Sequence, residues 1–137
     1  RPRNLFVAEF IGSPKMNLLP VEIVEASKGG VTVRTAAGEM VRVAVAADEA
    51  AAGDRATLGV RPEHLALSGD GDAVSGRVTF VETLGHATYA YLEAGGTPLT
   101  VQLPGDVRPA AGETLKLIVP AGQGHLFDAD GEAFARL

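Results

Sequence analysis

The stretch VEIVEASKGGVTV, residues 21–33, decides the fold class of this chain. Val21 and Ile23 precede Lys28-Gly29-Gly30, and Val31 and Val33 follow it, so apolar and polar side chains alternate on both sides of a glycine turn. Successive side chains of a strand point to opposite faces of a sheet, and this alternation is typical of half-buried strands. The stretch therefore predicts two antiparallel strands joined by a tight turn.

The same alternation recurs in short segments along most of the chain. Strand-like segments precede and follow a break at Ser68-Gly69-Asp70-Gly71-Asp72; they lie at 40–45, 56–60, 74–82, 88–92, 99–103 and 114–119. Short strands with almost no helix between them are typical of small antiparallel barrels. We expect an all-β fold of two OB-like barrels, built from strand sets of about 17–67 and 73–137. Each set is near the lower size limit for its own core, so the two should pack together.

A helical pattern precedes the first strand. Between Leu5 and Ile11, apolar residues recur at spacings of three and four, which predicts one apolar face of a short helix that Gly12-Ser13-Pro14 would end. A helix of this length is not stable alone in water. We therefore expect residues 1–16 to form a connecting helix that docks on another part of the protein.

Composition limits the classes of function. The chain has 137 residues and a net charge of -5, so it lacks the basic field that would hold a nucleic-acid backbone, and we expect no nucleic-acid partner. It has no cysteine, which excludes thiolate metal sites and cysteine nucleophiles within these residues. The three histidines, His64, His86 and His125, lack the spacing of metal ligands, so we expect no metal site.

Catalytic motifs are absent from these residues as well. The sequence contains no Gly-x-Ser-x-Gly elbow and no Gly-Lys pair of the kind that a Walker phosphate loop requires. We therefore expect no catalytic residue and no cofactor in this stretch of chain.

Polar side chains gather around Pro62 in GVRPEHL, residues 59–65. Pro62 favours extended backbone at Arg61, which would present the guanidinium rigidly, with Glu63 and His64 just past the bend. A rigid arginine suits a bidentate contact with a carboxylate. Arg61, Glu63 and His64 are therefore candidates for contact with a partner or across a dimer interface. The alternative is that Arg61 and Glu63 pair with each other and His64 is an ordinary surface residue.

A second group of candidates lies at His125-Leu126-Phe127-Asp128. His125, Phe127 and Asp128 are candidates for an interface. The alternative, which we favour, is that Leu126 and Phe127 close the barrel while their polar neighbours cap a turn.

Four motifs carry a resemblance to a known family. FVAEFIGSPKMN at 6–17 resembles the FVAGFIGSPxMN segment of ATP-binding subunits from bacterial importers of the maltose, trehalose and sn-glycerol-3-phosphate type, except that Glu9 replaces the usual glycine. Residues 59–65 resemble their GVRPEHL motif, residues 81–85 their VExLG, and residues 125–128 with the terminal Arg136-Leu137 their HLFDxxGxxL ending. In this order and spacing, the motifs resemble the transport-associated OB (TOBE) regulatory domain of that family.

The resemblance implies a non-catalytic domain at the C-terminal end of a longer ATPase subunit, and hence that the present chain is a piece of one. ATP and Mg would belong to a nucleotide-binding domain preceding residues 1–16. The implied partners are that domain, a second copy in a homodimer, transmembrane permease subunits and, in some members, a signalling protein of sugar metabolism. The resemblance also implies that the domain lies in the cytoplasm, peripheral to the inner face of the membrane. It further implies that Arg61 contacts a partner or lies in the dimer interface.

An alternative from another class is a small-ligand domain, because related transport-associated barrels hold oxyanions such as molybdate. An oxyanion requires converging amides, hydroxyls or cations, and the sequence offers only Ser13 with Lys15, and Arg61. The negative net charge also disfavours this reading.

Overall fold

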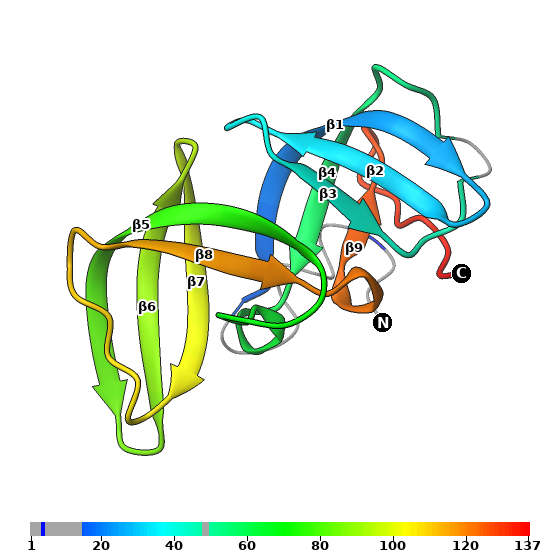
Figure 1. Cartoon of the computed structure of the whole chain (residues 1–137). Coiled ribbons are helices and arrows are strands. Elements are labelled where there is room, and N and C mark those ends of the chain that lie inside the picture. The colour runs from blue at the N-terminus through cyan, green and yellow to red at the C-terminus, as the bar shows by residue number, and fades with distance from the viewer. Residues whose placement is uncertain (1–3, 5–14, 48–49) are drawn as a thin grey trace.

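The computed structural model describes Asn4 and residues 15–47 and 50–137. These residues form strands and two short 3-10 turns, in two sheets that lie side by side (Figure 1). The strands are β1 (Asn17–Ser27), β2 (Gly30–Thr35), β3 (Met40–Val43), β4 (Arg55–Val60), β5 (Asp72–Leu84), β6 (Ala87–Ala94), β7 (Thr97–Pro104), β8 (Thr114–Val119) and β9 (His125–Phe127); the turns are η1 (Pro62–His64) and η2 (Ala121–Gln123). The prediction of an all-β fold is confirmed.

The first sheet has the strand order β3-β2-β1-β4-β9, and every pairing in it is antiparallel. The predicted hairpin lies at its centre, where β1 and β2 pair from Val21 opposite Thr35 to Ser27 opposite Gly30. Gly30 has a φ of 130°, and a Cβ there would lie 2.5 Å from the carbonyl oxygen of Val43. Glycine is therefore required where the hairpin meets β3.

The second sheet has the order β7-β6-β5-β8 and is also antiparallel throughout. β5 is its longest strand, with 13 residues, and it pairs with both β6 and β8. In β7, Leu99, Val101 and Leu103 are buried and alternate with less buried residues, as expected for a strand with one face on the core.

One hydrophobic core joins the two sheets. Val33 and Leu58 from the first sheet and Val74 and Leu117 from the second are fully buried in the same cluster. Each buried aliphatic side chain of this kind contributes about 1.5–3 kcal/mol relative to an exposed one. The expectation that the two strand sets pack against each other is confirmed.

Polar side chains add hydrogen bonds between the sheets. The amide of Asn17 donates from Nδ2 to the carbonyl of Thr100 at 2.8 Å and accepts from the N–H of Thr100 at Oδ1, also at 2.8 Å. Asn17 therefore covers part of β7, an edge strand. In addition, the Asp72 carboxylate accepts from the N–H of Arg42 at 2.8 Å.

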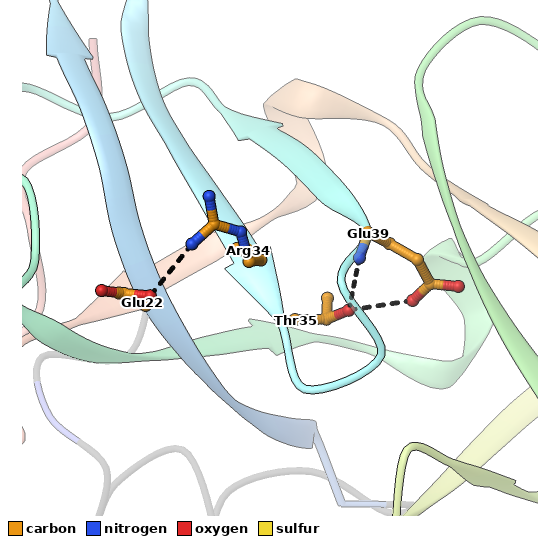
Figure 2. A network of polar contacts seen from close by, with 4 residues as sticks. All are labelled: Glu22, Arg34, Thr35 and Glu39. Carbon is orange, nitrogen blue, oxygen red and sulfur yellow. Dashed lines mark hydrogen bonds and ion pairs between the residues drawn. The ribbon is translucent and has the colours of Figure 1, made fainter.

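Glu39 connects the β2–β3 turn to the second sheet. One carboxylate oxygen accepts from the N–H of Ser75 at 2.8 Å, and the other accepts from the hydroxyl of Thr35 at 3.0 Å. Figure 2 shows that the Thr35 hydroxyl also accepts from the N–H of Glu39, at 3.2 Å, and that Arg34 pairs with Glu22 nearby. The β2–β3 turn thus orients the Glu39 carboxylate toward β5.

The sheets differ from the expected strand sets in one respect. β9, which falls in the set 73–137, pairs with β4 and belongs to the first sheet. The chain therefore builds most of the first sheet, then the second, and returns to complete the first. The helix predicted within residues 1–16 lies outside the described residues.

Among the described residues, no helix has the length and apolar character needed to cross a bilayer.

Candidate functional site

Arg61 lies where β4 ends and η1 begins. Its backbone is extended, with φ of -74° and ψ of 146°, as predicted from the proline that follows. Pro62 is buried, Arg61 is half-buried and Glu63 is exposed. Arg61 and Glu63 form no ion pair with each other; the ion pair found within the described residues joins Arg34 to Glu22. The local pair of the alternative interpretation is therefore not formed.

His64 is half-buried and carries an unsatisfied atom. Its Nδ1 is buried and has no hydrogen-bond partner within the described part of the chain. Leaving a buried polar atom without a hydrogen bond costs about 1–3 kcal/mol of stability. Native folds therefore rarely contain such an atom, and a specific reason for it is expected at His64.

The pairing of β9 with β4 brings the two candidate motifs together. His125 lies opposite Gly59, two residues before Arg61, although the motifs are far apart in the sequence. A Cβ at Gly59 would lie 2.7 Å from Sδ of Met16 and 2.9 Å from Cε2 of Phe127. The glycine thus leaves room for Met16 and Phe127 to pack beneath the paired strands.

Positive groups surround His125. Burial, and after it the charges of Arg136, Arg61 and His64, together lower the pKa of His125 from 6.5 to about 4. His125 is therefore neutral at pH 7, and this half-buried patch keeps its positive charge on the arginines. We call Arg61, His64 and His125, with the exposed Glu63 beside them, the RPEH surface.

Phe127 and Asp128 have structural contacts. Phe127 is fully buried and packs with Met16, so it is not available to a partner. The Asp128 carboxylate accepts from the N–H groups of Asp130 and Glu132, both at 2.9 Å. In this geometry Phe127 closes the fold and Asp128 caps the turn that follows.

Sequence reasoning missed the role of Arg136. Its guanidinium donates to the carbonyls of Gly122 and Gly124, which fixes η2 immediately before His125. The only sequence signal was its place in the terminal motif, because the contact depends on the chain returning to the first sheet.

A hollow of about 490 Å³ lies apart from the RPEH surface. Its lining includes Asp54, Arg55, Asp130 and Phe134 but none of the RPEH residues. Among the described residues, no three His, Asp or Glu side chains are placed to hold a metal ion.

Two family models match the chain, and they meet at this surface. The MalK OB fold domain matches residues 12–65, and the TOBE domain matches residues 58–127. The chain belongs to the TOBE domain family. The shared residues of the two matches, 58–65, contain η1 and the RPEH motif of this TOBE domain.

Curated relatives match this TOBE domain over nearly its whole length. It is 43% identical to the maltose/maltodextrin import ATP-binding protein MalK of Vibrio vulnificus over 99% of the chain and 38% of that protein. It is 36% identical to the alpha-glucoside transport ATP-binding protein AglK of Rhizobium meliloti, over 98% of the chain and 38% of the relative. It is 39% identical to the sn-glycerol-3-phosphate import ATP-binding protein UgpC of Chromobacterium violaceum, over 95% of the chain and 34% of that protein. The chain thus spans little more than a third of these relatives, and the resemblance noted in its motifs is confirmed.

A solved structure shares the fold. The cytoplasmic molybdate-binding protein ModG, solved with molybdate bound, matches with a TM-score of 0.64 at 18% identity, over 80% of this chain and 94% of ModG. At this identity the similarity concerns the fold alone, and it supports the OB-like architecture.

Proposed function

We propose that this TOBE domain is the non-catalytic regulatory and dimerisation domain of the ATP-binding subunit of a sugar importer. The observation that carries the proposal is the match, over 95–99% of the chain, to import and transport ATP-binding proteins of which it spans 34–38%. ATP and Mg would be bound, and ATP hydrolysed, in a part of the subunit outside the matched region. Residues 1–16 would connect to that part, and residues 17–137 would form the regulatory domain.

Similarity to import ATP-binding proteins supports the partners that we propose for this domain. A second copy of the subunit and transmembrane permease subunits would complete the importer, and this domain would then lie in the cytoplasm, peripheral to the inner face of the membrane. A signalling protein of sugar metabolism would be a further partner. A partner that binds only one arrangement of the importer shifts the equilibrium by its differential affinity.

The RPEH surface is the proposed point of contact. Arg61 is half-buried, extended and free of an ion pair with Glu63, so its guanidinium is available for a carboxylate of a partner or of the second copy. Glu63 is exposed beside it, and the unpaired Nδ1 of His64 would be explained by a small rearrangement on binding. His125 adds a neutral, half-buried ring to the same surface.

Replacing Arg61 tests this proposal. In the full-length ATP-binding subunit, Arg61→Ala should leave the circular dichroism spectrum unchanged and weaken dimerisation or regulation of transport by about tenfold. The matched control is Arg34→Ala, which removes an exposed arginine that pairs with Glu22, and which should change neither property. Unchanged dimerisation and unchanged regulation in the Arg61 variant would remove Arg61 from the contact.

The oxyanion alternative is not favoured, because the named relatives are transporter subunits and ModG shares only the fold. Titration calorimetry of this chain with molybdate, tungstate and sulfate should give no submicromolar binding. Tight binding of any of these ions would restore the alternative.

A further inference from the structure

The hollow of about 490 Å³ lies between the start of β4 and the segment that follows β9. Its volume falls within the range of small-molecule sites, about 300–1,000 Å³. Its described lining has an apolar part and a charged part; the apolar side chains are Ile23, Phe134 and four alanines, and the charged ones are Asp54, Arg55, Asp128 and Asp130. The hollow therefore offers two kinds of contact to a ligand.

The charged side chains lie at the rim of the hollow and the apolar ones at its floor. Asp54, Arg55 and Asp130 are exposed, whereas Ile23 is 1% exposed and Phe134 is half-buried and packs against the hydrophobic core. A ligand in the hollow would therefore meet charged groups around its edge and an apolar surface beneath it.

Backbone hydrogen bonds hold the walls of the hollow in place. The carbonyl of Asp54 accepts from the N–H of Ile23 at 2.8 Å, which fixes the start of β4 against β1. Beyond β9, the N–H of Phe134 donates to the carbonyl of Leu126, also at 2.8 Å, so this segment is held against β9. The hollow is thus formed before any ligand binds, as sites for small molecules usually are.

Arg55 has no partner among the described residues, although three carboxylates line the same hollow. Its guanidinium forms no ion pair and no hydrogen bond there, and the ion pair in the described part of the chain joins Arg34 to Glu22. The Asp130 carboxylate is likewise unbonded within the described residues, while its backbone N–H donates to Asp128. A guanidinium carries five N–H donors, and a carboxylate accepts at two oxygens. Donors and acceptors are therefore available at the rim.

The charges at the rim select the class of ligand. A simple anion would meet three carboxylates, and a simple cation would meet the unpaired Arg55. A neutral molecule with several hydroxyl groups avoids both costs, because each hydroxyl can donate to a carboxylate or accept from a guanidinium. A sugar ring has hydroxyls at its edge and C–H groups on its faces, which matches a charged rim above an apolar floor.

We propose that the hollow binds a neutral saccharide. Its hydroxyl groups would bond to Arg55 and Asp130, and one face of a sugar ring would lie on Ile23 and Phe134. The inference rests on the proposed function, which brings imported sugar to the same side of the membrane as this domain. It deepens that function by assigning the domain a sugar site of its own, apart from the RPEH surface.

The pairing of β4 with β9 connects the hollow to the RPEH surface. Arg55 begins β4 and Asp128 directly follows β9 at one end of the pair, and Gly59 lies opposite His125 at the other end. A saccharide that bridges Arg55 and Asp130 would hold the two strands together, so saturating sugar should slow amide hydrogen exchange in β4 and β9. Exchange that sugar leaves unchanged would overturn this connection.

Titration of the chain with maltose, trehalose and glucose tests the site. At least one of these sugars should shift the amide NMR signals of Arg55 and Asp130 and approach saturation below about 10 mM. No shift with any of the three at that concentration would overturn the proposal. Shifts confined to residues outside the hollow would overturn it as well.

Two substitutions at the rim test the contacts. Arg55→Ala and Asp130→Ala should each raise the dissociation constant of the sugar that binds by about tenfold. Both side chains are exposed, so circular dichroism should show an unchanged fold. The matched control is Arg34→Ala, which removes an exposed arginine of the same sheet outside the hollow and should leave the affinity unchanged. Wild-type affinity in both rim variants would contradict the assignment.

Leucine and putrescine distinguish a saccharide from other classes of ligand. Leucine is a zwitterion that could pair with Arg55 and Asp130 together, and putrescine is a dication that would favour the carboxylates. Each should bind more weakly than the sugar, because specificity is a difference of affinities. Tighter binding of leucine or putrescine than of every sugar would overturn the assignment to a saccharide.

Failure of this inference is distinguishable from failure of the proposed function. A chain that binds no sugar, but in which Arg61→Ala alters dimerisation or regulation of the subunit, would overturn the sugar site alone. Sugar binding that Arg55→Ala weakens, with neither property altered by Arg61→Ala, would support the sugar site and count against the proposed contact at Arg61.

Discussion

The charge state of His125 depends on folding. In the folded chain burial and the charges of Arg136, Arg61 and His64 lower its pKa to about 4, whereas an unfolded chain would protonate it near 6.5. Above pH 6.5 the residue is neutral in both states and does not affect stability. As the pH falls from 6.5 toward 4, the unfolded chain binds the proton first, so the free energy of unfolding decreases.

His125→Gln tests this dependence. The wild-type chain should lose on the order of 2 kcal/mol of stability through this residue between pH 7 and pH 4, and the variant should lose correspondingly less. Urea unfolding at a series of pH values measures the difference. The control is His86→Gln, which changes an exposed residue of the β5–β6 turn; a profile altered equally by both variants would contradict the assignment to His125.

Local sequence predicted part of the RPEH surface. The extended backbone of Arg61 follows from its proline neighbour and needs no distant residue. The unpaired Nδ1 of His64 and the bonds of Arg136 to two glycine carbonyls could not be predicted, because both depend on how distant segments pack. The partner role of Arg61, Glu63, His64 and His125 stays a prediction.

At the scale of elements, Asn17 joins two strands that belong to different sheets. Its side-chain amide makes both hydrogen bonds that a neighbouring strand would make to Thr100, and Asn17 is itself buried. A buried backbone group that loses such a partner leaves an uncompensated cost.

Asn17→Ala should therefore destabilise the chain by about 2 kcal/mol, because it leaves the N–H and C=O of Thr100 without partners. Chemical unfolding followed by circular dichroism measures the change. Arg34→Ala, which breaks the exposed ion pair with Glu22, should cost less than about 0.5 kcal/mol and serves as the comparison. Equal costs for the two variants would show that Asn17 is not a structural link.

Period-two alternation was sufficient to predict most of the strands. The hairpin of β1 and β2 and the strands after the 68–72 break were visible as apolar residues between glycine turns. The pattern did not predict that β9 belongs to the first sheet. His125–Phe127 is too short to show a period, and its partner strand is distant in the sequence. Sheet membership depends on register, which a strand pattern alone does not specify.

At the scale of the whole molecule, the two sheets share one hydrophobic cluster, to which both contribute fully buried side chains. Neither sheet could separate without exposing side chains of the other. We therefore expect the chain to unfold in a single cooperative transition, as small domains with one core usually do.

Tyrosine fluorescence provides the test, since the chain has no tryptophan and both of its tyrosines, Tyr89 and Tyr91, lie on β6 of the second sheet. Leu58→Ala, in the first sheet, should destabilise the chain by about 2–5 kcal/mol and shift the tyrosine signal and the circular dichroism signal together. Leu117→Ala in the second sheet should shift both in the same way. A tyrosine transition that Leu58→Ala leaves unmoved would show that the sheets unfold independently.

The return of β9 has a consequence for synthesis on the ribosome. β1 to β4 emerge first, yet the strand that covers the outer side of β4 is translated only after the whole second sheet. Until then Met16 and Gly59 lack the Phe127 ring that packs on them. A nascent chain stalled before residue 125 would therefore hold an incomplete first sheet with an accessible apolar slot, the kind of surface that chaperones and quality-control proteases recognise.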